Sequence, residues 1–184
     1  MHSLLEQAQD RMKKSVAVLR EDLQSLRAGR ATPALVEKLH VEYYGTPTPL
    51  QQVAQISVPE PRLLVIQPWD KSLVPVIEKA ILKSDLGISP TSDGIVLRLA
   101  IPALTEERRR ELVKVLHRKA EEEKVAVRNV RRDALEHLKS EHKSGKLPED
   151  ELRRLENELQ KITDRMVAEI DQTVVAKEKE ILEV

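Results

Sequence analysis

Hydrophobic residues recur at helical spacing along three stretches of the chain, residues 1–29, 105–144 and 148–184. Each stretch is rich in charge and poor in proline, and its apolar residues return every three or four positions, which places them on one side of an α-helix. The repeats are Leu5, Met12, Leu19 and Leu26 in the first stretch, Val113, Ala120, Val127 and Ala134 in the second, and Leu152, Leu155, Leu159, Ile162 and Met166 in the third. Three helices with one apolar side each are expected to pack together as a bundle.

The ends of these predicted helices carry residues that favour the end or the start of a helix. Gly29 can adopt the left-handed conformation that ends a helix, and Pro33 prevents the first helix from continuing. The turn "SGKLPED" places Gly145 after the second helix and Pro148 near the start of the third. Because a helix rises about 1.5 Å per residue, the second and third should each be about 55 Å long, which makes the bundle a rod.

Residues 30–104 differ in composition from the helical stretches. Nine of the ten prolines and all three aromatic residues lie between Pro33 and Pro102. The segments "LHVEYYG", "VAQISV", "RLLVIQ" and "IVLRLAI" predict strands, and "SLVPVIEKAILKSDLG" predicts a helix from about Ser72 to Gly87. The predicted fold is therefore α+β with two domains: a long antiparallel three-helix bundle, residues 1–29 and 105–184, interrupted by a small β/α/β sandwich domain at 30–104.

Only two chain crossings join these predicted domains, near residues 28–31 and 101–104. Few covalent constraints then fix the angle between them, and we expect a hinge. The expected hinge residues are Gly29, Arg30, Ala31, Pro102 and Leu104. The alternative is a junction that packs rigidly.

The composition narrows the class of protein. The chain of 184 residues has no cysteine, so it has neither disulfides nor thiolate metal ligands, as is usual in a reducing compartment. No apolar run is long enough to span a membrane, and the absence of an N-terminal extension favours a bacterial cytoplasmic location. The formal net charge is zero, which confines any nucleic-acid contact to one face of the molecule.

Catalytic and metal-binding patterns do not emerge from the sequence. His137 and His142 are five residues apart, a spacing that does not place two imidazoles on one helical face. Glutamates 121–123 form a charge run of the kind that is usually solvated on a long helix. In the predicted small domain only His40 and dispersed carboxylates are available. We therefore expect no catalytic site, no metal and no cofactor.

The clearest candidate site is a basic stripe on the second predicted helix. At about 100° per residue, its members fall within about 100° of one face. They are Arg110, Lys114, His117, Lys124, Arg128, Arg131, Arg132 and Lys139. Residues 105–143 hold 12 Lys or Arg against 9 Asp or Glu, whereas residues 148–184 hold 6 against 11. Two interpretations remain open: ion pairs with the acidic third helix, or contact with phosphate groups through guanidinium donors.

Five segments resemble the signatures of the ribosome recycling factor family, in the order and spacing of that family. They are "LRAGRATPAL" (26–35), "VEYYGTPTPL" (41–50), "SDLGISP" (84–90), "LTEERR" (104–109) and "VAVRNVRRDA" (125–134). The resemblance spans nearly the whole chain and implies the same architecture, with a bundle of transfer-RNA-like dimensions hinged to a smaller domain.

By this resemblance the protein is a translation factor and not an enzyme. It binds the post-termination ribosome across the aminoacyl and peptidyl sites of the large subunit. With elongation factor G and GTP it then promotes splitting into subunits and release of messenger RNA and transfer RNA. The family match implies that Arg128, Arg131 and Arg132 contact ribosomal RNA; Arg110, Lys114 and Lys124 join them by face geometry.

Arg27 and Arg30, beside the expected hinge, either reach phosphate or brace the interdomain angle, and bracing is preferred for Arg30.

The rival classes are a coiled-coil scaffold that binds another helix and an enzyme with its site in the small domain. The scaffold requires an apolar patch outside the bundle seams, which the second helix lacks. We expect a monomer that binds no membrane.

Overall fold

The computed structural model describes residues 1–24, 26 and 29–183. The chain divides into two compact units. Residues 1–27 and 106–183 make up the helical unit, and residues 28–105 make up the small unit.

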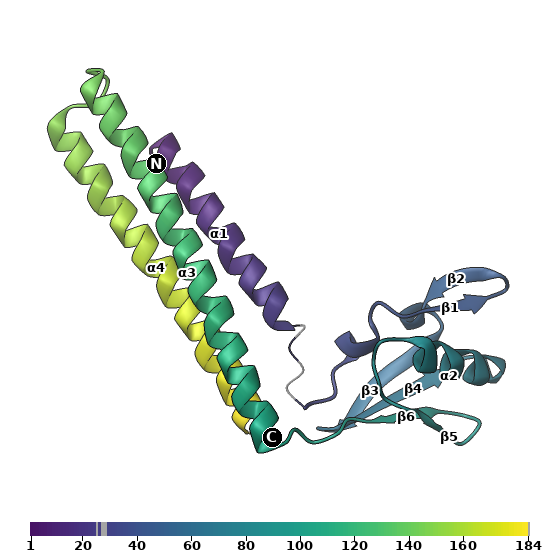
Figure 1. The fold of residues 1–184 in the computed structure, drawn as a ribbon. Coiled ribbons are helices and arrows are strands. Elements are labelled where there is room, and N and C mark those ends of the chain that lie inside the picture. Colours follow the sequence, from purple (N-terminus) through teal and green to yellow (C-terminus); the bar gives the residue numbers. More distant parts are fainter. Residues whose placement is uncertain (25, 27–28, 184) are drawn as a thin grey trace. The chain divides into compact units, whose positions relative to one another are not determined.

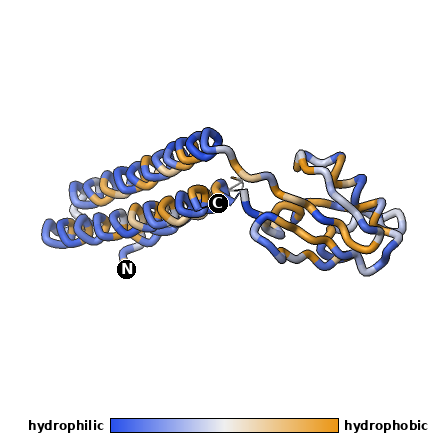
Figure 2. Tube along the Cα trace, turned by 90° about the horizontal axis from the view of Figure 1, so that it is seen from below, coloured by the Kyte–Doolittle hydropathy of each residue, from blue (hydrophilic) through white to orange (hydrophobic). Residues whose placement is uncertain are grey.

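The helical unit consists of three helices that lie side by side (Figure 1). They are α1 (Ser3–Gln24), α3 (Glu106–Lys143) and α4 (Glu149–Leu182). Helices α1 and α3 are antiparallel: His2 pairs with Glu141 near the end of α3 at 3.5 Å, and Asp22 pairs with Lys119 in the first half of α3 at 4.0 Å. Figure 2 shows hydrophobic positions recurring at intervals along otherwise hydrophilic helices, as the sequence pattern predicts.

The interior of the helical unit is aliphatic. Its fully buried side chains include Leu5, Met12, Leu19, Leu116 and Leu138, and burying each such side chain stabilises the fold by about 1.5–3 kcal/mol. The seven-residue repeat assigned Val113 to this core, but Val113 is only half-buried and Leu112 is buried in its place. The reason is that the helical period of about 3.6 residues drifts from a strict seven-residue repeat.

The turn between α3 and α4 follows the predicted chemistry. Gly145 has φ +78°, a left-handed conformation that costs glycine little. The amide of Lys146 donates to the carbonyl of Glu141, and that of Gly145 to the carbonyl of His142, both at 3.0 Å. This is the Schellman pattern, which satisfies carbonyls left open at a helix end.

The small unit contains an antiparallel four-stranded sheet, a two-stranded ribbon and one α-helix. The sheet order is β3 (Ala54–Glu60), β4 (Leu63–Pro68), β6 (Leu97–Ala100) and β5 (Thr91–Ser92). The ribbon pairs β1 (His40–Tyr43) with β2 (Thr46–Pro49). Helix α2 (Val74–Lys83) is preceded by a 3-10 turn at Lys71–Leu73; further 3-10 turns lie at Pro33–Val36 and Leu50–Gln52.

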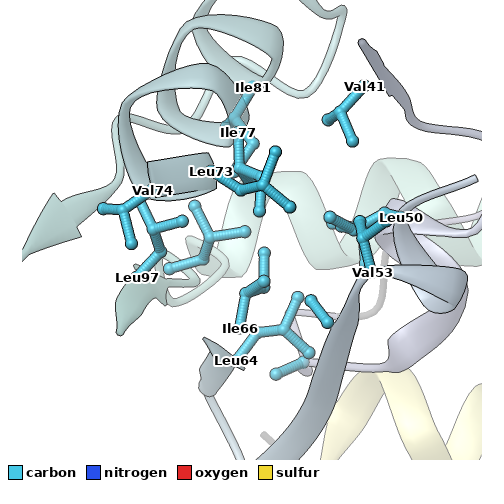
Figure 3. Close-up of a cluster of buried hydrophobic side chains, with 14 residues drawn as sticks. Val41, Leu50, Val53, Leu64, Ile66, Leu73, Val74, Ile77, Ile81 and Leu97 are labelled. Carbon is cyan, nitrogen blue, oxygen red and sulfur yellow. The ribbon is translucent and has the colours of Figure 1, made fainter. Parts of the chain in front are cut away.

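A compact aliphatic core holds the small unit together. Figure 3 shows Ile77 and Ile81 of α2 pointing toward Leu64 and Ile66 of β4, with Leu50 beside them. These five side chains are at most 1% exposed. The alternation predicted for the strands is visible in β4, where Leu64 and Ile66 are buried while their neighbours are more exposed.

Two strands of the small unit were not predicted. Strand β2 reads "TPTP", and proline cannot donate to a sheet ladder. In the observed register Pro47 faces Glu42 and Pro49 faces His40. These positions alternate with the hydrogen-bonded pairs of an antiparallel ribbon, so both prolines fall where no amide is needed. Strand β5 has only two residues, too few to give an alternating pattern.

The predicted fold class is confirmed: long helices are combined with a small antiparallel sheet domain. None of the helices in the described part of the chain carries an apolar run long enough to cross a membrane.

Candidate nucleic-acid interface

Helix α3 is covered on three sides, and the side that remains is basic and exposed. One side is buried in the core of the helical unit. A second faces α4, and a third lies next to α1. Between these contacts runs an exposed row that we call the outward stripe. Its members are Arg110, Lys114, Arg128, Arg132 and Lys139.

The structure divides the predicted basic stripe, because three of its members turn toward α4. Lys124 forms an ion pair with Asp171 of α4. His117 lies 3.6 Å from Glu178. Arg131 is half-buried, and its Nη1 donates a hydrogen bond to Oε1 of Gln160 at 3.0 Å. These three side chains therefore connect α3 with α4 instead of pointing away from the bundle.

The half-buried position of Arg131 also leaves one of its nitrogen atoms without a hydrogen-bond partner. Its Nε atom is buried and has no hydrogen-bond partner within the described residues. A buried, unpaired donor costs about 1–3 kcal/mol. The side chain is thus constrained by packing, and the expectation that Arg131 belongs with Arg132 on one exposed face does not describe the structure. The physical reason is the short angular distance: at about 60° from Arg128, Arg131 already lies on the edge that α4 covers.

The outward stripe holds its arginines loosely. Arg128 Nη1 is 3.4 Å from Oε1 of Glu121, and Arg110 Nη2 is 2.6 Å from Oε1 of Glu106. Arg132 is exposed and makes no hydrogen bond or ion pair within the part of the chain that the structure describes. Exposed ion pairs contribute about 0–1 kcal/mol, so an incoming phosphate can replace these glutamates at little cost.

A shallow groove between α1 and α3 extends the basic surface. It encloses about 400 Å³. Its lining residues are Arg11, Lys14, Ser15, Ala126, Asn129 and Val130. Arg11 Nη2 contacts Oδ2 of Asp133 at 3.2 Å, and the small side chains of Ser15 and Ala126 leave room for the hollow. Asn129 brings an amide that can both donate and accept.

Arg11 and Lys14 were missed by the sequence analysis. The first predicted helix carries five Lys or Arg residues, and the sequence alone does not show which of them lie beside the second predicted helix. They become candidates only because the antiparallel packing of α1 and α3 brings them beside Asn129. The available signal was the i, i+3 spacing of two cations outside the apolar repeat.

The two ends of the outward stripe differ in electrostatics. Arg110 and Lys114 line a second hollow of about 400 Å³ together with Glu106, Glu107 and Glu111. A phosphate entering there meets three carboxylates. Arg128 and Arg132 instead lie one and three residues along α3 from Asn129, which lines the groove together with Arg11 and Lys14. The middle of α3 is therefore the better anion-binding region.

The chain crosses between the units twice, and the crossings meet one turn of the small unit. The amide of Ala31 donates to the carbonyl of Pro61, and the amide of Ile101 donates to the carbonyl of Arg62, each at 2.8 Å. Gly29 has φ +72°. Arg30 and Pro102 are exposed and Leu104 is half-buried. Ala28, at the start of the first expected crossing, and Arg27 beside it lie outside the described residues.

The histidine and carboxylate side chains of the described residues do not form a metal site. Within residues 1–24, 26 and 29–183, no three His, Cys, Asp or Glu side chains gather closely enough to hold a metal ion. His142 lies at the α3–α4 turn, where its Nδ1 is 2.8 Å from the carbonyl of Leu147. His40 Nδ1 is 3.0 Å from the carbonyl of Lys38.

Comparison with known proteins finds ribosome recycling factors that are similar over nearly the full length of this chain. The family model for ribosome recycling factor matches residues 19–182. The ribosome-recycling factor of Desulforamulus reducens is 62% identical over 181 residues, 98% of each chain. That of Heliobacterium modesticaldum is 56% identical over 184 residues, with both chains fully covered.

Two solved structures are similar to the whole chain. A solution structure of the ribosome recycling factor is 47% identical, with a TM-score of 0.79 over 98% of this chain and 96% of that one. The other comes from models of the T. thermophilus ribosome recycling factor and the E. coli elongation factor G bound to the E. coli post-termination complex. It is 50% identical, with a TM-score of 0.64 over 97% of both chains. A match of this length in sequence and in fold establishes that the chain belongs to the ribosome recycling factor family.

Proposed function

We propose that this protein dismantles the ribosome after termination. It binds the large subunit across the aminoacyl and peptidyl sites and, with elongation factor G and GTP, promotes splitting into subunits and release of messenger RNA and transfer RNA. The observation that carries this proposal is the full-length similarity to a recycling factor described on a post-termination complex together with elongation factor G. The protein acts in the cytoplasm, where ribosomes work.

The helical unit supplies the contact with ribosomal RNA. Arg128 and Arg132 of α3, with Arg11 and Lys14 across the groove, bind phosphate oxygens through charge-assisted hydrogen bonds. Arg110 and Lys114 contribute less, because three glutamates surround them. Lys124 and Arg131 act mainly by fixing α3 against α4, which keeps the outward stripe straight.

The small unit transmits force and performs no chemistry of its own. Elongation factor G hydrolyses GTP and pushes the small unit. The two crossings pass this push to the helical unit, which displaces a contact between the ribosomal subunits. Arg30 braces the hinge. The factor works as a monomer without a cofactor, and the energy comes from its partner.

The test is light scattering of post-termination ribosomes mixed with elongation factor G and GTP. The native protein is compared with the double variant Arg128→Ala/Arg132→Ala and with Arg153→Ala as a control. Arg153 is an exposed arginine on α4 that pairs with Glu149. We expect the native protein and the control to lower the scattering equally, and the double variant to require at least tenfold more protein, since each lost charge-assisted bond contributes about 1.5–3 kcal/mol.

The possible outcomes test the recycling function and the location of the phosphate contacts separately. If the native protein leaves the scattering unchanged, the recycling function is wrong. If the double variant splits ribosomes as well as the control, the function stands and the phosphate contacts lie elsewhere. Circular dichroism of all three proteins verifies that the helices are intact.

A further inference from the structure

Two polar side chains in the middle of helices face one groove and leave their hydrogen-bonding groups unused. Ser15 lies within α1 and Asn129 lies within α3, and both line the groove between these helices. Neither side chain makes a hydrogen bond within the described residues. Serine and asparagine favour a helix less than alanine does, so both positions weaken their helices without gaining a contact in the protein.

Two threonines of α4 show how a hydroxyl group inside a helix can be satisfied. Oγ1 of Thr163 donates to the carbonyl of Leu159 at 2.8 Å, and Thr173 makes the equivalent bond four residues back at 2.8 Å. The carbonyl four residues earlier is a common partner for a hydroxyl inside a helix. Ser15 is half-buried and makes no such bond, so its hydroxyl group stays available to a ligand in the groove.

The groove is lined by matching positions on both helices, spaced i, i+3 and i+4, which places them on one side of each helix. They are Arg11, Lys14 and Ser15 on α1, and Ala126, Asn129 and Val130 on α3. Val130 is buried and Ala126 is half-buried, so the bottom of the groove is apolar. The volume of about 400 Å³ falls within the range of about 300–1,000 Å³ that is typical of small-molecule sites.

The two cations of the groove are held differently. Lys14 is exposed and makes no hydrogen bond or ion pair within the part of the chain that the structure describes. Arg11 Nη2 lies 3.2 Å from Oδ2 of Asp133. An ion pair of this kind engages the edge of the guanidinium group and leaves its flat faces available, and nucleic-acid bases stack on such faces. Lys14 can therefore bind an anion, while Arg11 can cover a flat ring.

An unpaired nucleotide of RNA matches these groups. Its phosphate requires a cation, its base has flat faces, and the edge of its base carries hydrogen-bond donors and acceptors side by side. The amide of Asn129 also presents a donor and an acceptor side by side. In a paired nucleotide that edge is already bonded to the opposite strand, so only an unpaired nucleotide can use Asn129 fully. An acidic protein segment is disfavoured, because its carboxylates would use Lys14 but offer no flat ring to the apolar bottom.

We propose that the groove between α1 and α3 binds one unpaired nucleotide of RNA. Asn129 and Ser15 bond to the edge of its base, Arg11 stacks on the base, and Lys14 binds its phosphate. This inference rests on the proposed contact of the helical unit with RNA and adds selectivity to it. The outward stripe binds phosphates in any RNA segment, whereas the groove requires a nucleotide whose base is not paired.

The test compares two RNA hairpins that differ in a single base. One carries a bulged uridine in its stem, and the other carries an abasic nucleotide at the same place, so both have the same number of phosphates. Binding to the full-length protein is followed at low salt by the fluorescence anisotropy of the labelled RNA. We expect the native protein to bind the uridine hairpin about two- to tenfold more tightly, since the abasic hairpin lacks one or two hydrogen bonds to the base.

Alanine variants assign this preference to the groove. Asn129→Ala should bring the ratio of the two affinities close to one, and Ser15→Ala should lower it in part. The matched control is Asn157→Ala, which removes an exposed asparagine within α4 that does not line the groove and should keep the full ratio. Because alanine favours a helix more than serine or asparagine does, thermal unfolding should show equal or higher stability for all three variants.

The double variant Arg128→Ala/Arg132→Ala separates the groove from the outward stripe. It should weaken binding of both hairpins by the same factor and leave their ratio unchanged, since these arginines contact phosphates and not the base. A ratio that is lost in this double variant but kept in Asn129→Ala would place the base at the outward stripe and overturn the proposal.

Other results would also overturn it. These are equal affinity of the native protein for the two hairpins, binding of neither hairpin, or the same ratio in Asn129→Ala and Asn157→Ala. Displacement of both hairpins by a glutamate-rich peptide, with no preference for the uridine, would make the groove a site for an acidic protein segment. If the native protein splits ribosomes in the scattering assay but shows no preference for the uridine, the recycling function stands and the nucleotide site is wrong. If it shows the preference but does not split ribosomes, the recycling function fails and the nucleotide site stands.

Discussion

Arg131 and Arg132 are adjacent in sequence but contact different surroundings, so replacing each with alanine should damage different properties. Arg131 is half-buried and donates to Gln160 of α4 at 3.0 Å. Arg132 is exposed and has no partner among the described residues. We expect Arg131→Ala to lower the stability of the helical unit and Arg132→Ala to lower the affinity for the large ribosomal subunit.

The size of each effect follows from these contacts. Arg131→Ala loses one hydrogen bond, about 0.5–1.5 kcal/mol, and the packing of its aliphatic stem, which contributes a similar amount. Removing the unpaired buried Nε offsets part of this loss. The net destabilisation is about 1 kcal/mol. Arg132→Ala changes stability by less than about 0.5 kcal/mol, since the site is exposed.

For affinity to the large ribosomal subunit, we expect Arg132→Ala to have the larger effect and Arg131→Ala the smaller one. A phosphate contact by Arg132 contributes about 1.5–3 kcal/mol, so Arg132→Ala should weaken binding about ten- to a hundredfold. It should also reduce the slope of log affinity against log salt concentration by about 1, because one fewer counterion is released. Arg131→Ala should leave this slope unchanged.

Two measurements on the same preparations decide the matter. Urea unfolding followed by helical circular dichroism gives the stability, and binding of fluorescently labelled protein to purified large subunits at several potassium chloride concentrations gives the affinity and the slope. Equal affinity and slope for Arg132→Ala and native protein would refute the phosphate contact. A loss of affinity with Arg131→Ala as large as with Arg132→Ala, without loss of stability, would refute the division of the stripe.

Three further predictions test other parts of the molecule. Asp93 accepts bonds from the amides of Ile95 and Val96 and from Arg98, which lowers its pKa to about 2; since the unfolded value is about 3.9, its contribution is present above about pH 4 and is lost as the pH falls toward 2. Asp93→Asn should therefore flatten the acid dependence of small-unit unfolding in that range, and an unchanged profile would contradict this. Leu116 is fully buried, so Leu116→Ala should destabilise the helical unit by about 2–5 kcal/mol in urea unfolding, while Val175→Ala at a 65% exposed site should change it by less than about 0.5 kcal/mol. Insertion of Gly-Ser after Ala103 should preserve large-subunit binding but abolish splitting in the scattering assay; loss of both together would count against the small unit as a lever.

The long helices could be predicted from sequence because several local signals agree. The residue ranges 105–144 and 148–184 correspond to α3 and α4 within two residues at each end. The apolar repeat sets the buried side, and Gly145 with Pro148 fixes the turn between them. Local propensity and packing point the same way here, so no tertiary information is needed.

The sides of α3 could be predicted only in part. Angular spacing separates apolar residues from basic ones, but it does not say which edges of the polar side neighbouring helices cover. Arg131 and Lys124 therefore look equivalent to Arg132 until α4 is in place. The same limit hides Arg11 and Lys14, whose relevance depends on the packing of α1 beside α3.

The strands were less predictable for a related reason. Strand β2 conflicts with propensity at Pro47 and Pro49, and only the register with β1 makes those residues acceptable. Tyr44 was assigned to a strand, where alternation would send its ring to the face opposite Tyr43. It lies instead in the turn with positive φ, because the sheet register places the two-residue loop there.

The backbone hydrogen bonds at the β3–β4 turn bear on how a lever could work. Ala31 and Ile101 donate to the consecutive carbonyls of Pro61 and Arg62, so both crossings are tied to the same point of the small unit. The hinge that we propose therefore lies outside these two anchors, and a rotation there leaves the sheet hydrogen bonds of the small unit intact. In the proposed mechanism, a push on the small unit reaches both crossings together, which is the coupling that splitting by elongation factor G requires.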